Sequence, residues 1–543
     1  MSPRGNRILY LLFSPQDYFL LSAAATSESP ASRSKVAQNF AWTALEMILL
    51  TLGTLAVGIA VARTIGPRRL AYFNYVYWLT TAGSLLGCMG IPGTTFKYMG
   101  ELLGSGENGA ARAVYRHTLR LQAMIAIVIA SCGLVAVLLW GDPQYRLVSL
   151  LMVVSVVPQM LGFIPSQANR AAEDFRANTL ASLGAEFLNM AGIVASLLLH
   201  WNLVGIAATI LLCRTGEFIG KAAAVSRRQK GFPNIPLPEH LRRRMWNFTG
   251  LGTGLLLLQV IVWDRSDIIF LKWLATDIRQ VAFFSISFTL ADRLLQIPQA
   301  FGSAVGATQM AEYGRDRQKL FRITGVAGIY VLMAAMPMLV GAACLSAPLV
   351  STIYGSQYLP AISVFTLVAI LAIPKAVLAP AQSLLYSTEE LGFLLKWGCL
   401  SGVVNIALDV LLIPHMGARG AALGNGLAQA VAAVGIWSRA FWRHPVRIDV
   451  KAALKVLAAT LLMVAVVVPI ARSGWPGPLK LVLGIAAGAV VYLSAIRIQR
   501  VFSREDRQRL VYVTMKIPKF VGRTAILLVN FIAPVPSTVE ASS

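Results

Sequence analysis

Long apolar runs separated by short polar segments repeat along almost the whole chain. Because an α-helix needs about 20 predominantly apolar residues to cross the hydrocarbon core of a bilayer, each run predicts one membrane span. The predicted spans fall near residues 40–62, 71–99, 117–140, 147–168, 180–200, 203–224, 247–274, 281–304, 321–345, 360–387, 392–413, 418–441, 451–472 and 478–499. The pattern therefore predicts an all-α polytopic membrane protein with about 14 transmembrane helices.

Neither end of the chain carries an apolar run of this length. The longest run in residues 1–38, ILYLLF, is too short for the core of a signal peptide, so we expect a cytoplasmic N-terminal extension there. Residues 501–543 combine several basic residues with TAILLVNFIAPV, which is too short to span a bilayer. This segment predicts a basic amphipathic cytoplasmic tail at the membrane surface.

The first six spans and the next six match each other in sequence. When the chain is aligned with itself so that PSQ at 165–167 matches PAQ at 380–382, Gly205 also matches Gly420. Nearer the start of each series, a slightly smaller shift places AYF at 71–73 on AFF at 282–284 and Glu101 on Glu312. Since a repeat of six spans begins and ends on the same side of the membrane, two such repeats have the same direction. We expect two six-helix bundles related by duplication.

The repeat also predicts how the chain is divided and where its helices bend. The expected parts are an N-lobe of spans 1 to 6 at residues 39–230, a C-lobe of spans 7 to 12 at 231–445, and two extra helices at 446–500. Prolines fall at matching places, Pro92 with Pro298 and Pro158 with Pro374. Proline frees backbone carbonyls within a span, so we expect interrupted helices at these places.

Small residues form a stripe along the span predicted at 418–441. Gly420, Gly424, Ala428, Ala432 and Gly435 recur every three or four residues, which is the spacing of one helix face. Such a stripe lets neighbouring backbones approach closely in lipid, where hydrophobic association is weak. We interpret it as a packing surface rather than a substrate contact.

The composition agrees with a membrane protein, because 56% of the residues are hydrophobic, only 13% are charged and the mean hydropathy is +0.65. The formal net charge of +24 has two interpretations. Lys and Arg concentrate in every second loop, which is typical of cytoplasmic loops and places both termini in the cytoplasm. Nucleic-acid binding is disfavoured because the charges are spread over many short loops. We expect the basic clusters to face anionic membrane lipids.

Sequence motifs of catalysis and metal binding are missing from the chain. It has no GxxxxGK[ST] motif, its five cysteines lie in apolar runs without metal-ligand spacing, and its five histidines are scattered. We therefore expect no enzyme activity, no cofactor and no metal centre. A membrane glycan polymerase is the less favoured alternative, because the loops predicted outside the cell are short for a catalytic region.

Charged residues inside the predicted spans are the best candidates for a functional site, because an ionised group is costly in hydrocarbon. The basic candidates for substrate binding are Arg265, Arg293, Lys375 and Arg214. A guanidinium group matches phosphate oxygens in a bidentate way, so this set indicates a phosphate-bearing substrate. The acidic candidates for ion coupling are Asp264, Asp267 and Asp292. Structural ion pairs between the two sets remain an equal alternative.

The internal repeat helps to choose between binding and structure. The alignment of the two halves matches each cation with an uncharged residue. The matched pairs are Arg265 with Thr54, Arg293 with Ala82, Lys375 with Gln159, and Arg214 with Gln429. A bundle with the same fold therefore forms without a cation at each place, which favours a functional role.

Three segments resemble the polysaccharide transporters, including the Wzx-type oligosaccharide flippases, of the multidrug, oligosaccharidyl-lipid and polysaccharide exporter superfamily. They are VARTIGPRRLAYFNYVYWL at 61–79, RSDIIFLKWLATDIRQVAFFSISFTLADRL at 265–294 and LIPHMGARGAALGNGLAQA at 412–430. The resemblance covers about residues 36–500 and departs where the family's Leu-Gly-Pro-Glu is Ile-Gly-Pro-Arg at 65–68.

The resemblance implies a flippase that moves a polyprenyl-pyrophosphate-linked oligosaccharide across the bacterial cytoplasmic membrane by alternating access. It further implies a place in the biosynthesis of O-antigen, capsule or exopolysaccharide. The implied partners are the lipid-linked glycan, membrane lipids, and the glycan polymerase and glycosyltransferases of the same pathway. A multidrug exporter of the same superfamily is the alternative.

The loop charges predict the outcome of a topology experiment. The loop that carries RRQK and RRR is expected in the cytoplasm, so a reporter fused near Asn234 should report the cytoplasm. A reporter fused near Gln357 should report the outer face. Alkaline phosphatase and green fluorescent protein fusions at both positions give the measurement, and the opposite result at either position contradicts the orientation.

Overall fold

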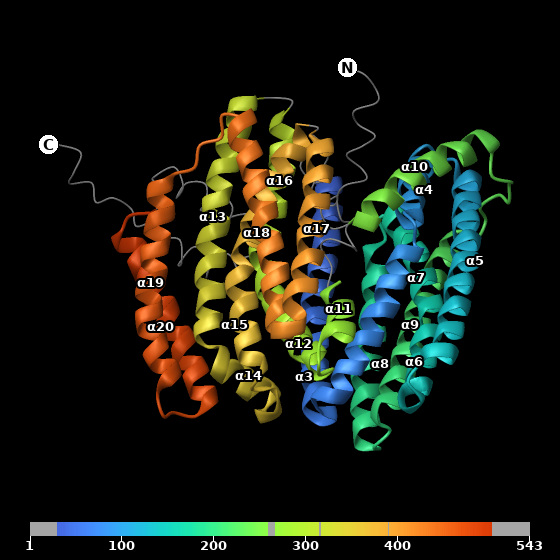
Figure 1. The fold of residues 1–543 in the computed structure, drawn as a ribbon. Coiled ribbons are helices and arrows are strands. Elements are labelled where there is room, and N and C mark those ends of the chain that lie inside the picture. Colours follow the sequence, from blue (N-terminus) through green and yellow to red (C-terminus); the bar gives the residue numbers. More distant parts are fainter. Residues whose placement is uncertain (1–29, 259–265, 314–315, 389, 502–543) are drawn as a thin grey trace. The chain divides into compact units, whose positions relative to one another are not determined.

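The computed structural model describes residues 30–501 except 259–265, 314–315 and 389 (Figure 1). Every regular element in these described residues is a helix, which confirms the all-α prediction. The helices are α3 (Pro30–Gly87), α4 (Ile91–Gly104), α5 (Asn108–Trp140), η1 (Pro143–Tyr145), α6 (Arg146–Val154), α7 (Val156–Ala171), α8 (Phe175–Leu198), α9 (Asn202–Arg228), α10 (Glu239–Leu258), α11 (Asp267–Leu274), α12 (Arg279–Tyr313), α13 (Arg317–Cys344), α14 (Ser346–Tyr354), η3 (Ser356–Tyr358), α15 (Ala361–Leu371), α16 (Ile373–Ser387), α17 (Leu391–Met416), α18 (Ala418–Arg443), α19 (Val450–Arg472) and α20 (Gly477–Ile498).

Many of these helices have the length and composition of membrane spans. In the described part of the chain, ten helical segments are long and apolar enough to cross a bilayer. This confirms a polytopic membrane protein, while the total of about 14 spans stays a prediction. Of the predicted extension at 1–38, residues 1–29 lie outside the described part and residues 30–38 belong to α3; of the predicted tail at 501–543, only residue 501 is described.

Two breaks divide the first part of the chain into helices. Gly66, inside α3, has φ 76° and ψ 168°, a conformation that glycine adopts without steric cost, and Pro67 follows it. This bend separates the first two predicted spans. A second break lies between α3 and α4, where Gly90 has φ 70° and Pro92 occupies the first turn of α4. The interruption predicted at Pro92 is confirmed.

Interrupted helices also occur at the other matched prolines, with one exception. The span near Pro158 breaks at Ser155, between α6 and α7, and the span near Pro374 breaks at Ala372, between α15 and α16. By contrast, α12 continues through Pro298, so the predicted interruption there is wrong. A membrane helix tolerates an internal proline when the freed backbone groups are satisfied by local adjustments and neighbouring helices.

By its internal contacts the chain divides into unit 1, residues 1–285 and 398–425, and unit 2, residues 286–397 and 426–543. The boundaries fall within α12, α17 and α18. The lobes predicted at 39–230 and 231–445, with two extra helices at 446–500, stay a prediction.

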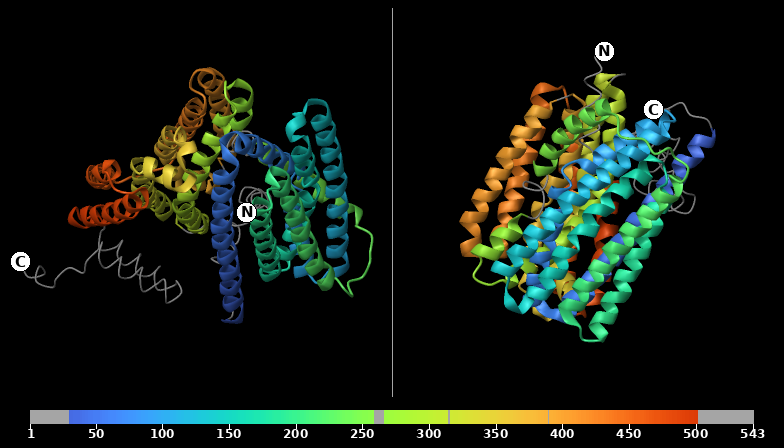
Figure 2. Two further views of the ribbon diagram at one scale, coloured as in Figure 1. Left: turned by 90° about the horizontal axis from the view of Figure 1, so that it is seen from below. Right: turned by 90° about the vertical axis from the view of Figure 1, so that its right-hand side faces the viewer.

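In unit 1, α7, α8 and α9 pack together, and α4 and α5 pack against α7 (Figures 1 and 2). Fully buried apolar side chains fill the space between α4, α5 and α7, among them Tyr98, Met99, Val114 and Ile164. In lipid this interdigitation matters more than in water, because dispersion contacts replace the hydrophobic effect as the source of helix association.

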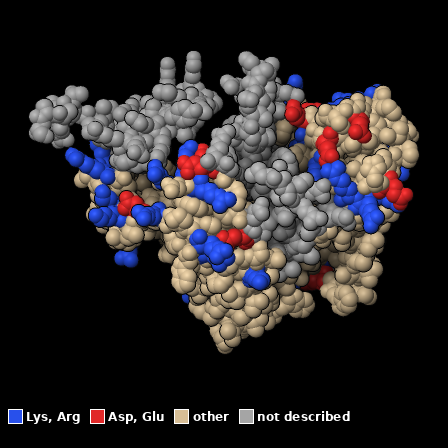
Figure 3. Space-filling model, turned by 90° about the horizontal axis from the view of Figure 1, so that it is seen from above, with Lys and Arg blue, Asp and Glu red and all other residues tan. Residues whose placement is uncertain are grey.

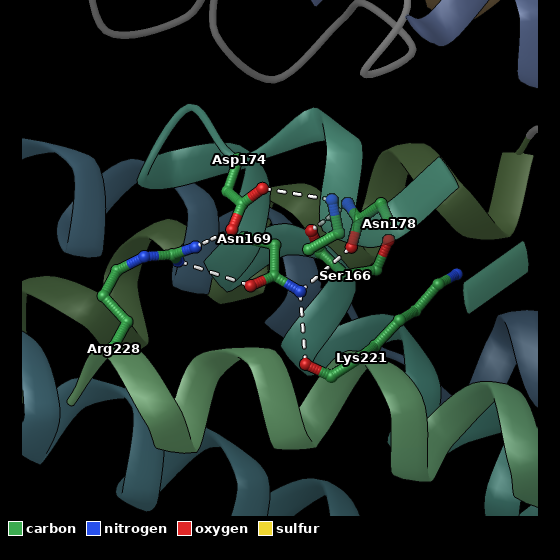
Figure 4. Close-up of polar contacts among 7 residues, drawn as sticks. Ser166, Asn169, Asp174, Asn178, Lys221 and Arg228 are labelled. Atoms are coloured by element: carbon green, nitrogen blue, oxygen red, sulfur yellow. Dashed lines mark hydrogen bonds and ion pairs between the residues drawn. The ribbon is translucent and has the colours of Figure 1, made fainter. Parts of the chain in front are cut away.

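Buried polar residues join the α7–α8 connection to the end of α9 through hydrogen bonds and an ion pair (Figure 4). We call this set of residues the first polar clasp. Asn169 donates from Nδ2 to Asn178 Oδ1 at 3.1 Å and to the Lys221 carbonyl at 3.2 Å. The Arg228 guanidinium pairs with Asp174 and also donates to Asn169 Oδ1 at 3.3 Å. Since Asn169 and Asn178 are almost fully buried, these bonds satisfy polar groups that lipid does not solvate.

In unit 2, α13 packs against α15, α16 and α19, and α19 packs along α20 (Figures 1 and 2). The buried residues Val456, Met463 and Val467 of α19 and Tyr492 of α20 form one cluster with Leu345. Tyr492 donates its hydroxyl proton to the Met333 carbonyl of α13 at 2.8 Å. The two C-terminal helices, α19 and α20, are therefore packed within unit 2.

A second polar clasp joins the α16–α17 connection to the end of α18. Glu390 accepts a hydrogen bond at 2.5 Å from Arg439 Nε and lies 2.8 Å from His444 Nε2. The shift along the chain that places Asp174 on Glu390 also places Arg228 on His444. The two clasps thus join corresponding connections and helix ends, which supports the internal duplication.

The small-residue stripe of α18 lies where neighbours approach closely. A Cβ atom built at Gly420 would lie 2.5 Å from the Leu412 carbonyl oxygen of α17, and one at Gly435 would lie 1.7 Å from the Trp397 ring. These distances are far below van der Waals contact, so only glycine fits. The packing interpretation of the stripe is supported at both ends.

This packing predicts a stability difference between two glycines of neighbouring helices. Gly435→Ala should lower the free energy of unfolding by about 1–3 kcal/mol, because the Trp397 ring must move away from Val431, whose carbonyl accepts its Nε1 proton. Gly398→Ala is the matched control, since a Cβ there meets nothing within 4 Å. Thermal unfolding of the purified proteins in detergent gives the comparison, and equal melting temperatures for the two variants contradict the packing.

Candidate functional site

Arg214, one of the predicted substrate-binding residues, lies in the middle of α9 in unit 1. Its Nη1 donates to Ser155 Oγ at 2.7 Å, and its guanidinium carbon lies 5.5 Å from the centre of the Tyr77 ring. Ser155 is the residue at which the α6–α7 span breaks. Glu217, one turn along α9, pairs instead with Lys221 at 2.6 Å. Arg214 is therefore held by a hydroxyl group and an aromatic face.

Lys375 and Arg293, two further predicted cations, both lie in unit 2. The Lys375 Nζ is 5.3 Å from the centre of the Phe288 ring and 4.0 Å from Asp292 Oδ1, the outer limit of an ion pair. The Arg293 Nε is buried and has no hydrogen-bond partner among the described residues. An unsatisfied buried guanidinium nitrogen is costly, and an anionic ligand would satisfy it.

Two predicted residues lie outside the described part of the chain. Arg265 and Asp264 fall in the segment 259–265. Asp292, predicted as an ion-coupling residue, lies 4.0 Å from Lys375 Nζ through its Oδ1. The equal alternative of a structural ion pair applies to Asp292 and Lys375.

Asp267, the remaining predicted ion-coupling residue, begins α11 and is fully buried in unit 1. Its Oδ1 accepts a hydrogen bond from Asn405 Nδ2 at 3.3 Å, and its Oδ2 accepts one from Asn425 Nδ2 at 3.0 Å. The carboxyl group of Asp409 lies against that of Asp267. We name these four residues the acid–amide cluster.

Asp409 gives the acid–amide cluster its chemistry. It is fully buried, and neither carboxyl oxygen has a hydrogen-bond partner among the described residues; the same holds for Asn405 Oδ1. Two adjoining buried carboxylates cannot both carry a full charge without compensation, so a shared proton or a bound cation is required. Carboxylate and amide oxygens are the ligands that hard cations prefer.

Sequence reasoning assigned only Asp267 of the acid–amide cluster to a site. Asn405 and Asp409 are four residues apart on α17 and therefore share a helix face, a signal that was present in the sequence. Asn425 stands inside the small-residue stripe, beside Gly424. A Cβ at Gly424 would lie 2.8 Å from Asp409 Oδ1, so the missing side chain makes room for the carboxyl group.

Basic side chains are prominent on the molecular face seen from above in Figure 3. In unit 1, Arg244 of α10 binds Glu101 at 2.8 and 3.3 Å through its two terminal nitrogens. A basic face of this kind is typical of the cytoplasmic side of a membrane protein. The orientation of the chain in the membrane stays a prediction.

Comparison with solved structures shows which fold these helices form. The lipid II flippase MurJ in an inward-closed conformation matches with a TM-score of 0.67 at 13% sequence identity, covering 84% of this chain and 98% of that one. An inward-facing multidrug resistance MATE family transporter of the MOP superfamily matches with a TM-score of 0.61 at 18% identity, covering 75% and 98%.

A third structure extends the same comparison. A MOP superfamily transporter from Pyrococcus furiosus, described as having a binding pocket of reverse polarity, matches with a TM-score of 0.56 at 16% identity, covering 79% and 98%. At these identities the likeness concerns the fold alone. Similar sequences among curated proteins were not found.

Comparison with family models identifies the chain itself. The model described as "Polysaccharide biosynthesis protein" matches residues 60–363, more than half of the sequence. The matched part includes the broken span at Ser155, the cations Arg214 and Arg293, and the acidic residue Asp267. This chain belongs to the polysaccharide biosynthesis protein family.

Proposed function

We propose that this protein is a flippase that carries a polyprenyl-pyrophosphate-linked oligosaccharide across the bacterial cytoplasmic membrane by alternating access. The observation that carries the proposal is Arg214, a guanidinium within a membrane helix held by a hydroxyl group and an aromatic ring. Because neither partner neutralises the charge, a phosphate-bearing headgroup is a fitting counter-ion. Membership of the polysaccharide biosynthesis family supports the same class of substrate.

The other cations extend the binding surface in the proposal. The Lys375 ammonium group lies 5.3 Å from the centre of the Phe288 ring and 4.0 Å from Asp292 Oδ1. Arg293 has an unsatisfied Nε, and Arg265 is included for its place within a predicted span. Guanidinium groups bind two phosphate oxygens at once, which gives a pyrophosphate group orientation as well as affinity.

The acid–amide cluster supplies a coupling site in the same proposal. Transport without an ATP motif needs another source of free energy, and a proton or a monovalent cation that binds Asp267 and Asp409 provides one. Binding would relieve the repulsion between the two carboxylates, so occupancy stabilises the packing of α11, α17 and α18 around them. Asp264 and Asp292 remain proposed members of the coupling machinery.

The proposed membrane location and partner enzymes follow from the proposed substrate. The protein would lie in the bacterial inner membrane with both termini in the cytoplasm, and glycosyltransferases would assemble its substrate before transport. A glycan polymerase outside would consume the product in O-antigen, capsule or exopolysaccharide synthesis. Both partners are inferred from the chemistry of a lipid-linked glycan.

Multidrug export is the second candidate, because the acid–amide cluster has the charge that a cationic drug or a coupling cation requires. The MATE transporters among the similar structures have this fold. The cations Arg214, Lys375 and Arg293 favour an anionic substrate instead. Drug resistance conferred by expression of the protein, without restored glycan export, would decide for the second candidate.

Neutralising the cations should reduce glycan export in cells that lack the native gene. Arg293→Ala and Lys375→Ala should each lower export by about tenfold or more, because each removes a charged hydrogen-bond partner of the phosphate. Arg214→Lys should also impair export, since lysine lacks the bidentate fork. Lys451→Ala, at an exposed position of α19, is the control. Normal export by the Arg293→Ala and Lys375→Ala proteins, at equal membrane levels, would remove both residues from the site.

Removing one carboxylate should abolish the stabilisation of the purified protein by its coupling ion. For the unmodified protein we expect sodium chloride, compared with choline chloride at equal ionic strength, to raise the melting temperature by about 2 °C or more. If protons are the coupling ion, lowering the pH gives the same rise. Asp409→Asn should lose the effect, whereas Glu239→Gln, at an exposed position, should keep it. An unmodified protein whose stability responds to neither ion contradicts the coupling site.

A further inference from the structure

The helices α4 and α10 come from different halves of the internal repeat, yet they pack together within unit 1 (Figure 1). α4 follows the break in the second predicted span, and α10 begins the seventh, which is the first span of the second repeat. In alternating access the two repeats rock against each other, so contacts between helices of different repeats must form and break in each cycle. The α4–α10 contact is of this kind.

An arginine joins the two helices at one end of the contact. Arg244 of α10 donates to both carboxyl oxygens of Glu101 of α4, at 2.8 and 3.3 Å. Its guanidinium carbon lies 5.2 Å from the centre of the Tyr98 ring, and Tyr98 donates its hydroxyl proton to the Arg244 carbonyl at 3.1 Å. Arg244 is therefore bound to α4 through its side chain and through its backbone.

Threonines continue the contact toward the middle of the span. The hydroxyl oxygens of Thr94 and Thr249 lie 2.8 Å apart, and Thr253 donates to the Met89 carbonyl at 2.7 Å. The pairs follow each other in opposite order along the two helices, so α4 and α10 are antiparallel. The α4–α10 ladder is the set Met89, Thr94, Tyr98, Glu101, Arg244, Thr249 and Thr253.

Each threonine of the ladder has a second acceptor in its own chain segment. Thr94 lies within hydrogen-bond distance of the Gly90 carbonyl at 3.3 Å, Thr249 of the Met245 carbonyl at 2.9 Å, and Thr253 of the Thr249 carbonyl at 2.9 Å. Such back-bonding to a preceding carbonyl is common for threonine in helices. When the helices separate, each hydroxyl proton keeps an acceptor, so the pairs break without leaving a donor unsatisfied.

The ion pair of the ladder can also separate at low cost. The side chains of Arg244 and Glu101 are 44% and 47% exposed, so water solvates both charges when they part. In the first polar clasp, by contrast, Asn169 and Asn178 are almost fully buried, and their separation would strand polar groups. The ladder therefore has the chemistry of a reversible contact, whereas the clasp has that of a permanent one.

We propose that the α4–α10 ladder is a gate, closed in this structure, that separates to admit the phosphorylated headgroup of the lipid substrate from the cytoplasmic side. The inference rests on the proposed function and adds to it the contact that controls access. Leu241 and Met245 of α10 are buried in the same apolar cluster as Tyr98, which favours the closed state. The ion pair adds to this closure, and the threonines allow the polar contacts to form again after each step.

The test measures the distance between the two helices in the purified full-length protein in lipid nanodiscs. Spin labels are attached at Gly93→Cys and Gly250→Cys, after alanine has replaced the five native cysteines. Both glycines neighbour ladder threonines, and a Cβ at either position meets nothing within 4 Å, so the labels leave the ladder intact. Double electron–electron resonance then reports the ratio of a long, open distance to a short, closed one.

Breaking the ion pair should favour the open state. Arg244→Gln and Glu101→Gln should each raise the ratio of open to closed protein about twofold to fivefold, the range of an exposed ion pair. Exchange of the two charges, Glu101→Arg with Arg244→Glu, should restore the closed state. Arg242→Gln is the matched control, because Arg242 pairs with Glu239 of its own helix at 2.7 Å. It should leave the ratio unchanged.

The same labels separate failure of the gate from failure of the proposed function. Distances that are identical in the unmodified, Arg244→Gln and Glu101→Gln proteins would overturn the gate, as would an equal shift in the Arg242→Gln control. Undecaprenyl diphosphate should raise the open fraction of the unmodified protein, whereas undecaprenol should not. If the substitutions open the ladder but undecaprenyl diphosphate leaves the distances unchanged, the gate stands and the proposed substrate is contradicted.

Discussion

Polar groups inside the hydrocarbon of a membrane must find their partners within the protein, and this constraint governs most of the features described here. Backbone groups are satisfied in helices, which is why every regular element of the described residues is helical. At Ser155, between α6 and α7, the side-chain hydroxyl oxygen accepts a hydrogen bond from Arg214 of α9. The buried amides Asn169 and Asn178 bond each other and neighbouring carbonyl groups for the same reason.

The same constraint explains why the exceptions indicate function. Asp409 is fully buried, and neither of its carboxyl oxygens has a hydrogen-bond partner among the described residues. Arg214 is held by neutral partners, although Glu217 is on the same helix and pairs with Lys221. Asp174 and Glu390, by contrast, have direct ion-pair partners in Arg228 and Arg439.

Duplication gives the molecule two copies of one scaffold with different chemistry. The clasps at Asp174 and Glu390 join corresponding connections and helix ends, and the spans near Pro158 and Pro374 break at corresponding places. The side chains beside these features differ, with arginine, lysine, glutamine and histidine exchanged between the copies. Backbone geometry is therefore shared by the two copies because packing requires it, while the charged side chains differ between them.

Apolar run length alone determined the fold class, because the bilayer requires long helices and leaves few alternatives. Proline spacing located three of the four expected breaks, but it did not show that α12 continues through Pro298. Arg214, Lys375 and Asp267 could be selected as candidate site residues from the sequence, because they are charged and lie deep within predicted spans. Only the tertiary structure decided their partners, since Asp409, Asn405 and Asn425 reach Asp267 from helices that lie far from it along the chain. Burial and contact between such distant segments depend on packing, which sequence periodicity does not specify.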